Sequence, residues 1–260
     1  MAKSENSMAK IDMSSIANHK VVLYLLLVSL LFNLLVGYVV VEKTDIVEKV
    51  LYKLGYGENP AMVFKRKVEF RCIQGWANTL NKLNLEADVV FFGNSLTYES
   101  DFGKYYPDLK IVNLGCNLDM LDDLINRSYM IKSVHPKKIF VLGGINNFQN
   151  TPLETFMEKY ETMVDSIMIY NPDADVYLQS LLPVNPSMGV GEIYVDCVKK
   201  IMDANKIIEM ISKTKNCTYI DLFSAYQVNE TLPPNNTRDG LHLYPESYEK
   251  WARIIEPYIR

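Results

Sequence analysis

Three side chain types that together activate a serine occur in two short segments far apart in this sequence. Ser95 ends the segment Gly93-Asn94-Ser95, and Asp239 and His242 stand three residues apart near the C-terminus. In such a set the histidine removes the hydroxyl proton, while the carboxylate fixes the tautomer of the ring and stabilises the imidazolium. Each segment alone is also typical of an ordinary strand end or surface turn, so the elements around them decide between the two interpretations.

A short apolar run precedes the serine and predicts a strand. Residues 89–92 are Val-Val-Phe-Phe, a pattern typical of a strand that is buried on both faces. Gly93 allows a tight turn after it. Ser95 is therefore expected at the carboxyl end of the strand, where open α/β sheets place their ligands. A helix is expected to follow, and its N-terminus would favour a developing negative charge.

Two further apolar runs end in small or amide residues. One ends at Gly115, and the other leads into Gly144-Ile145-Asn146-Asn147. A tetrahedral intermediate needs several N–H donors aimed at its oxyanion. The backbone N–H groups of Ser95 and Gly115 and the side-chain amide of Asn146 are the candidate donors.

These four segments, in this order, resemble the motifs of the SGNH (GDSL-type) hydrolases. The motifs are Gly93-Asn94-Ser95, then Gly115, then residues 144–147, then Asp239-Gly240-Leu241-His242, and the resemblance covers roughly residues 87–260. The sequence departs from the family at two positions outside the triad. Asn94 and Asn147 stand where the family commonly has aspartate.

The resemblance implies a role for each matched residue. Ser95 would be the nucleophile, Asp239 and His242 would complete the triad, and Gly115 and Asn146 would join the Ser95 amide in the oxyanion hole. It also implies ester chemistry that needs no metal or organic cofactor.

Apolar runs and helical patterns alternate along residues 87–260. Strands are expected at 88–92, 110–114, 138–142, 175–180 and 217–221, and helices at 118–133, 152–170, 190–213 and 246–258. Such alternation predicts βαβ units and a parallel sheet. We expect a three-layer α/β/α, flavodoxin-like sandwich with a five-stranded parallel sheet.

The region before this domain carries a long uncharged stretch. Residues 21–41 hold no charged side chain, and as a helix they would be about 31 Å long, enough to cross a bilayer core. They predict a transmembrane helix, with a cytoplasmic tail over 1–20 and a helical stalk or packing segment over 42–86. The alternatives are a cleaved signal peptide and a buried helix, and the length of the run argues against the first.

The charges that flank the stretch predict its orientation. Three lysines precede it, whereas the residues after it are mixed in charge. The positive-inside rule then places the N-terminus in the cytoplasm and the catalytic domain outside. A net charge of −4 gives no support for a nucleic-acid partner. The oligomeric state is left open.

The cysteines do not suggest a metal site or a second nucleophile. Their spacing, at Cys72, Cys116, Cys197 and Cys217, is unlike that of a zinc site. Cys116 follows Gly115 directly, and we interpret it as a small buried residue rather than a nucleophile.

We expect a membrane-anchored serine esterase that acts on short acyl esters, chiefly acetyl, on carbohydrate. Hydrogen-bonding residues are abundant in the loops expected near Ser95: Tyr98, Asn117, Asn147, Gln149, Asn185 and Tyr244. Leu181, Leu182, Val184 and Met188 could instead line an acyl groove, although core positions at a strand end are the favoured interpretation. The open alternatives are an O-acyltransferase acting on envelope glycan, a lysophospholipase or thioesterase, and a non-catalytic membrane-tethered binding module.

Overall fold

The computed structural model describes residues 13–43, 46–54, 60–83, 85–148 and 151–260. The chain divides into two compact units, residues 1–63 and 64–260. The second unit holds all the predicted catalytic residues.

Within the described residues, five parallel strands form one sheet in the order β2-β1-β3-β4-β5. The strands are β1 (Val89–Gly93), β2 (Ile111–Gly115), β3 (Lys138–Leu142), β4 (Asp175–Gln179) and β5 (Thr218–Ile220). All five lie within two residues of the ranges expected from the sequence. This strand order is that of the flavodoxin-like fold, so the predicted sheet is confirmed. The strand order reverses at β1, because β2 lies on one side of it and β3, β4 and β5 follow in turn on the other side. β1 is the strand that ends at Gly93.

Side chains that alternate along the strands build two separate cores, one on each face of the sheet. Val90 and Phe92 point into one core, and Val89 and Phe91 point into the other. Period-two alternation of apolar residues on both faces requires a covering layer of helices on each side. The sheet is therefore the middle layer of a three-layer sandwich.

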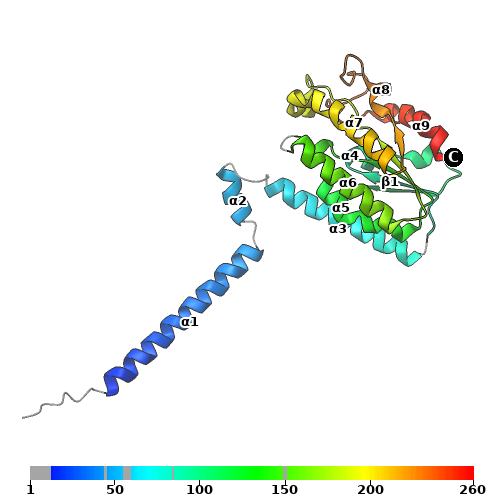
Figure 1. Ribbon diagram of the computed structural model, residues 1–260. Coiled ribbons are helices and arrows are strands. Elements are labelled where there is room, and N and C mark those ends of the chain that lie inside the picture. Colours follow the sequence, from blue (N-terminus) through cyan, green and yellow to red (C-terminus); the bar gives the residue numbers. More distant parts are fainter. Residues whose placement is uncertain (1–12, 44–45, 55–59, 84, 149–150) are drawn as a thin grey trace, which may run out of the picture. The chain divides into compact units, whose positions relative to one another are not determined.

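The helices divide between the two faces (Figure 1). One face packs against α3 (Pro60–Leu83), α5 (Leu121–Arg127), η2 (Ser128–Val134), α6 (Leu153–Tyr170) and α7 (Val198–Thr214). The other packs against α4 (Ser95–Tyr98), η1 (Phe102–Lys104), α8 (Leu222–Tyr226) and α9 (Pro245–Ile259). Ile73 and Ala77 of α3 are part of the first core, so this helix packs on the catalytic unit.

Two expected helices differ from the structure. The helix expected at 118–133 begins only at Leu121 and becomes a 3-10 helix at Ser128. The helix expected at 190–213 is split into the 3-10 helix η4 (Gly189–Cys197) and α7. The N–H of Gly191 donates to the carbonyls of Met188 and Asp239, which binds this segment to a neighbouring loop instead of to a regular helix.

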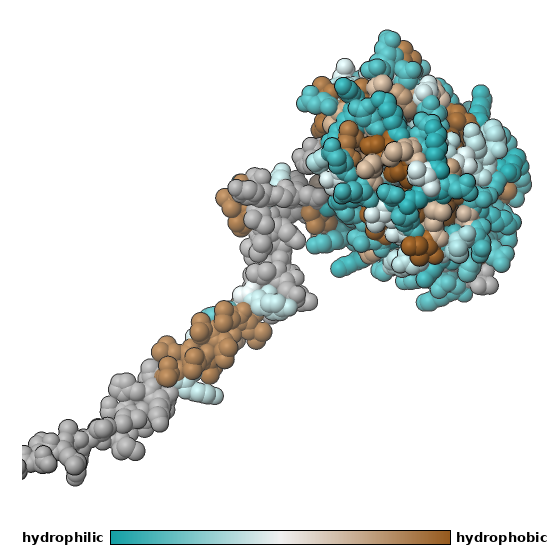
Figure 2. All heavy atoms as spheres, in the orientation of Figure 1, coloured by the Kyte–Doolittle hydropathy of each residue, from teal (hydrophilic) through white to brown (hydrophobic). Residues whose placement is uncertain are grey.

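The first unit contains the helices α1 (Met13–Lys43) and α2 (Ile46–Lys53). Apolar side chains are exposed along the described part of α1, residues 23–38 (Figure 2). Among the described residues, no helix is long and apolar enough to cross a membrane. The predicted transmembrane helix at 21–41 is therefore not found there, and both its ends lie outside the residues whose side chains are described.

Candidate active site

The fold brings Ser95, His242 and Asp239 into one hydrogen-bonded line. The Ser95 Oγ lies 3.1 Å from the His242 Nε2, and the His242 Nδ1 lies 2.7 Å from the Asp239 Oδ2. The residues that the sequence placed in two distant segments thus form a serine–histidine–aspartate relay. Ser95 is only 7% exposed, so most of the residue is buried.

The turn after β1 holds Ser95 in place. The Asn94 side chain accepts a hydrogen bond from the N–H of Leu96 at 3.1 Å and so caps α4. A Cβ on Gly93 would lie 2.1 Å from the carbonyl oxygen of Leu142 on β3. Only glycine lets β1 pass so close to β3 at this point, and the serine follows two residues later, beyond the carboxyl end of β1.

A tight turn aims Asp239 and His242 at the serine. The Asp239 Oδ1 accepts the backbone N–H groups of Leu241, at 3.0 Å, and His242, at 2.7 Å. Thr237 donates its hydroxyl to the His242 carbonyl at 2.8 Å and accepts the Gly240 N–H at 2.9 Å. The carboxylate is thereby fixed by its own backbone, and its second oxygen is left for the imidazole.

The loop after β4 supports this turn from behind. The Asn185 N–H donates to the Gly240 carbonyl at 2.7 Å, and the Gly191 N–H donates to the Asp239 carbonyl at 2.9 Å. Gly240 has a φ of +87°, and a Cβ there would lie 2.5 Å from the Asn185 carbonyl oxygen. The turn therefore needs glycine for both its conformation and its contact with this loop.

The charge state of Asp239 follows from these contacts. Burial raises the pKa of the Asp239 carboxyl. The hydrogen bonds from the N–H and ring of His242 and from the N–H of Leu241 lower it by more, so the pKa lies below its usual value. Asp239 is an anion at neutral pH, as stabilisation of an imidazolium requires.

Two of the three predicted oxyanion donors, the Ser95 N–H and the Asn146 amide, remain candidates in the structure. The Ser95 N–H lies in the first turn of α4, where N–H groups have no partner within the helix. The Asn146 Nδ2 donates to the Asp119 carbonyl at 2.9 Å, and an amide nitrogen carries a second hydrogen that can bind an oxyanion. Asn146 lies in η3 (Ile145–Asn147), directly after β3.

The third predicted donor, Gly115, does not fit this role. Its N–H already donates to the Asn113 Oδ1 at 2.8 Å. A Cβ on Gly115 would lie 2.2 Å from the backbone nitrogen of Tyr98, so the glycine lets β2 pack against α4. The prediction is wrong because the Asn113 side chain, whose Nδ2 donates to the carbonyls of Thr97 and Ser100, takes this N–H with its Oδ1.

A buried ion pair behind the site was missed by the sequence analysis. The Arg127 side chain is fully buried, and its Nε donates to the Asp119 Oδ2 at 2.5 Å. Its two terminal nitrogens donate to the carbonyls of Gly93 and Leu114, each at 2.8 Å. Arg127 thus joins the ends of β1 and β2 to the loop that carries Asp119, the partner of Asn146.

The same loop contains a residue with unusual backbone geometry. Leu118 has a φ of +66°, which is rare for a bulky residue. Strain of this kind concentrates at functional sites. Cys116, in the same loop, is 2% exposed, and burial raises the pKa of its thiol, so it is a neutral core side chain as interpreted from the sequence.

The six hydrogen-bonding residues that the sequence placed in loops near Ser95 differ in burial and in their contacts. Asn147 and Asn185 are buried and bonded to the backbone of Leu121 and Leu232, respectively. Asn117 donates to the Glu69 carboxylate at 3.4 Å. The remaining three are the exposed Tyr98 and Tyr244 and Gln149, which lies outside the described residues.

Sequence comparison identifies the family. The model of the GDSL-like lipase/acylhydrolase family matches residues 91–250, well over half of the chain. The protein belongs to this family, and it is an ester-hydrolysing enzyme of the SGNH type. Among curated proteins, none matches the chain.

Solved structures share the fold. A Streptococcus pneumonia protein, provisionally described as a platelet activating factor, is 20% identical with a TM-score of 0.68, over 84% of this chain and 100% of its own. A GDSL-like lipase from Bacteroides thetaiotaomicron is 22% identical with a TM-score of 0.61, and the match covers 74% of this chain and 98% of the lipase. A variant of an acetyl xylan esterase from Geobacillus stearothermophilus is 19% identical with a TM-score of 0.51, and the match covers 68% of this chain and 96% of the esterase.

Proposed function

We propose that the protein is a membrane-anchored serine esterase that removes short acyl groups, chiefly acetyl, from carbohydrate through an acyl-Ser95 intermediate. The observation that carries the proposal is the 3.1 Å contact between the Ser95 Oγ and the His242 Nε2, continued to Asp239 at 2.7 Å. A hydroxyl is a weak nucleophile until a base within hydrogen-bond reach takes its proton.

The reaction divides into two acyl transfers. His242 takes the Ser95 proton as the Oγ bonds to the carbonyl carbon, and the imidazolium then gives that proton to the departing alcohol as its C–O bond breaks. Water, deprotonated by His242, next attacks the acyl carbon and releases the acid, and the proton returns to Ser95. The Ser95 N–H and the Asn146 amide bind the oxyanion in both steps.

Burial of the apolar residues after β4 supports a short acyl group. Leu181, Leu182 and Val184 are each at most 3% exposed and belong to the two cores. These three are therefore core residues rather than the lining of an acyl groove, whereas Met188 of the same loop is half-buried. One structure of similar fold is an acetyl xylan esterase, which agrees with acetyl chemistry on a sugar.

A chain-length series tests the acyl part of the proposal. Each methylene buried in a hydrophobic pocket contributes about 0.8 kcal/mol, so an enzyme for long acyl chains gains strongly from acetate to octanoate. We expect kcat/KM for nitrophenyl esters to fall from acetate through butyrate to octanoate. The enzyme should also release acetate from acetylated sugars.

A second function, lysophospholipase or thioesterase, is favoured by one observation. Val190, Ile193 and Val195 expose their side chains on η4, which begins beside Asp239. These residues could receive an acyl chain. A rise in kcat/KM with chain length, together with no acetate release from any sugar, would favour this function over the first.

Transfer to a sugar hydroxyl instead of water would use the same triad. The acyl-Ser95 intermediate is common to both reactions, so the acceptor distinguishes them. Consumption of an acyl donor that requires an added sugar acceptor would identify an acyltransferase.

The proposed anchor is the uncharged stretch at residues 21–41, with the catalytic unit on the outer side of the membrane. Its support is the sequence itself and the exposed apolar side chains along residues 23–38 of α1. A reporter fused after Arg260 should be active only outside the cytoplasm. A mature chain that begins near Glu42 would show that the stretch is a signal peptide instead.

A further inference from the structure

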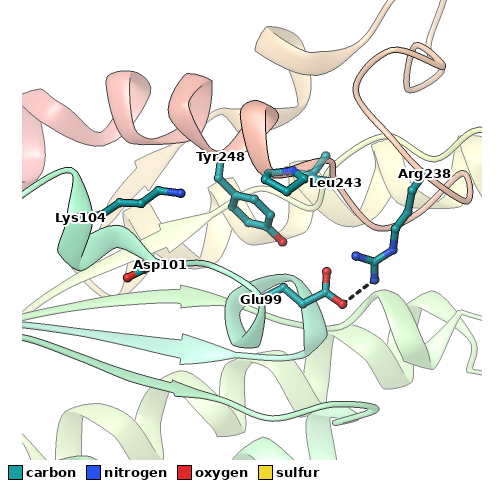
Figure 3. Close-up of a pocket in the computed structure, with 7 residues that line it drawn as sticks. Glu99, Asp101, Lys104, Arg238, Leu243 and Tyr248 are labelled. Atoms are coloured by element: carbon teal, nitrogen blue, oxygen red, sulfur yellow. Dashed lines mark hydrogen bonds and ion pairs between the residues drawn. The ribbon is translucent and has the colours of Figure 1, made fainter.

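A cavity of about 390 Å³ lies beside the candidate active site, between the end of α4 and the start of α9 (Figure 3). Its charged lining residues are Glu99, Asp101, Lys104 and Arg238, and the Tyr248 ring closes one side. The volume lies within the usual range for small-molecule sites. None of these residues was singled out as a site from the sequence.

The cavity is formed by the same two segments that carry the triad. The Glu99 N–H donates to the Ser95 carbonyl at 3.0 Å, so Glu99 lies one helical turn beyond the nucleophile on the same face of α4. Arg238 directly precedes Asp239, and its Nε lies 3.9 Å from the Asp239 Oδ2. An ion pair of 2.6 Å between Arg238 and Glu99 connects the two segments. The cavity therefore lies against the two segments that carry Ser95 and Asp239, although neither Ser95 nor His242 is among the residues that line it.

The lining suits a ligand with many hydroxyl groups. Beside the Glu99–Arg238 ion pair, the Asp101 carboxylate offers an acceptor and the Lys104 ammonium offers donors, so both partners that a hydroxyl needs are present. Asp101 and Lys104 are exposed, and in Figure 3 both lie at the side of the cavity opposite Arg238. Tyr248 is buried and its hydroxyl donates to the Leu96 carbonyl at 3.0 Å, so it lines the cavity with its ring. Leu243 and Pro245 also line the cavity, but its four charged side chains do not favour an acyl chain.

We infer that this cavity is the subsite for the alcohol part of the ester, and that its ligand is the sugar residue that carries the acyl group. The inference rests on the proposed esterase function and adds the site that recognises the sugar. Asp101 and Lys104 contact the sugar hydroxyls, while Ser95 reacts with the acyl carbon.

Two esters that share an acetyl group but differ in the alcohol test this inference. The variants are Asp101→Ala and Lys104→Ala, and the probes are mono-O-acetylated xylobiose and 4-nitrophenyl acetate. Loss of one charge-assisted hydrogen bond should lower kcat/KM for the sugar ester about tenfold, mainly through KM. The rate with 4-nitrophenyl acetate should stay within about twofold of the wild type, because its ring makes none of these bonds. Lys213→Ala, an exposed lysine of α7 paired with Glu209, is the matched control and should change neither rate.

The outcomes separate this inference from the proposed function. If the wild type releases acetate from the sugar and both variants do so equally well, the subsite assignment is overturned and the esterase proposal stands. If the wild type cleaves 4-nitrophenyl acetate but no acetylated sugar, the carbohydrate function and the sugar subsite both fail. A loss in the variants confined to lysophosphatidylcholine would assign the cavity to a charged lipid headgroup instead and would also overturn the sugar.

Discussion

The buried guanidinium of Arg127 donates a hydrogen bond of 2.8 Å to the carbonyl of Gly93, two residues before the candidate nucleophile. The same group is paired with Asp119, whose carbonyl accepts the Asn146 amide. One side chain therefore holds the serine turn and the loop of an oxyanion donor in a fixed relation. Arg127 acts as a positioning residue, because it reaches the reacting atoms only through these partners.

Arg127→Ala should destabilise the fold and the site together. Removal of one partner of a buried ion pair leaves an uncompensated charge and costs about 3–5 kcal/mol of unfolding free energy. Arg127→Lys keeps the charge but loses the planar guanidinium with its several donors. Compared with Arg127→Ala, we expect it to recover part of the lost stability and a smaller part of the lost kcat. Urea unfolding and kcat at low temperature, where each variant is folded, measure the two effects.

Arg253→Ala is the control for Arg127. Arg253 makes an exposed ion pair with Glu249 on α9, and such pairs contribute at most about 1 kcal/mol. A folded Arg127→Ala protein with wild-type kcat would show that the buried pair stabilises the chain without positioning the site.

The strands could be predicted because they are short apolar runs, and in β1 and β2 the run ends in glycine. Those ending at Gly93 and Gly115 were placed correctly within a residue. The helix α8 was missed, because its five residues are too few for a helical period to show. The split of the helix expected at 190–213 depends on a contact between Gly191 and Asp239, 48 positions apart in the sequence and invisible in its local pattern.

The candidate site was predictable where chemistry requires a residue type, and less so where geometry decides. Ser95, Asp239 and His242 meet as their motifs implied. Gly115 does not serve as a donor, because the Asn113 side chain takes its N–H. The role of Arg127 was missed, because a charged side chain in a helix is normally exposed and the three groups that accept its hydrogen bonds come from other elements.

Asn146→Ala should lower kcat about 100- to 1000-fold with little change in KM, because the oxyanion forms only in the transition state. Asn147→Ala should lower kcat less. Asn147 is buried and accepts the Leu121 N–H at 2.9 Å, so its loss should lower the melting temperature instead. Steady-state kinetics and thermal unfolding of both variants measure this contrast, and the reverse ranking would place the oxyanion donor one residue later.

Asp239 should make stability depend on pH. Its folded pKa is lowered, so the ionised carboxyl contributes stability above the ordinary aspartate pKa of about 4 and loses it as the pH falls through the folded value. Asp239→Asn should therefore be less stable than the wild type at pH 7, and the difference should narrow below about pH 4. Urea unfolding across this range measures it, and a constant difference would argue against the assigned contacts.

Asp239→Asn should also lower kcat by about 10³- to 10⁴-fold, because the amide cannot stabilise the imidazolium. Ser95→Ala and His242→Ala should each lower ester turnover at least about a thousandfold, and the double variant should be little worse than either, since the residues act as a unit. Retention of a tenth of the activity by Ser95→Ala would exclude Ser95 as the nucleophile. Circular dichroism should show that both single variants remain folded.

The most direct test of the account is to locate the covalent adduct formed by a fluorophosphonate probe. The probe reacts with a serine that an adjacent base has activated, which is the relation between Ser95 and His242 in this structure. We predict that mass spectrometry finds the adduct on the peptide that contains Ser95, and that His242→Ala abolishes it. An active enzyme without an adduct, or with one on a residue other than Ser95, would contradict the account.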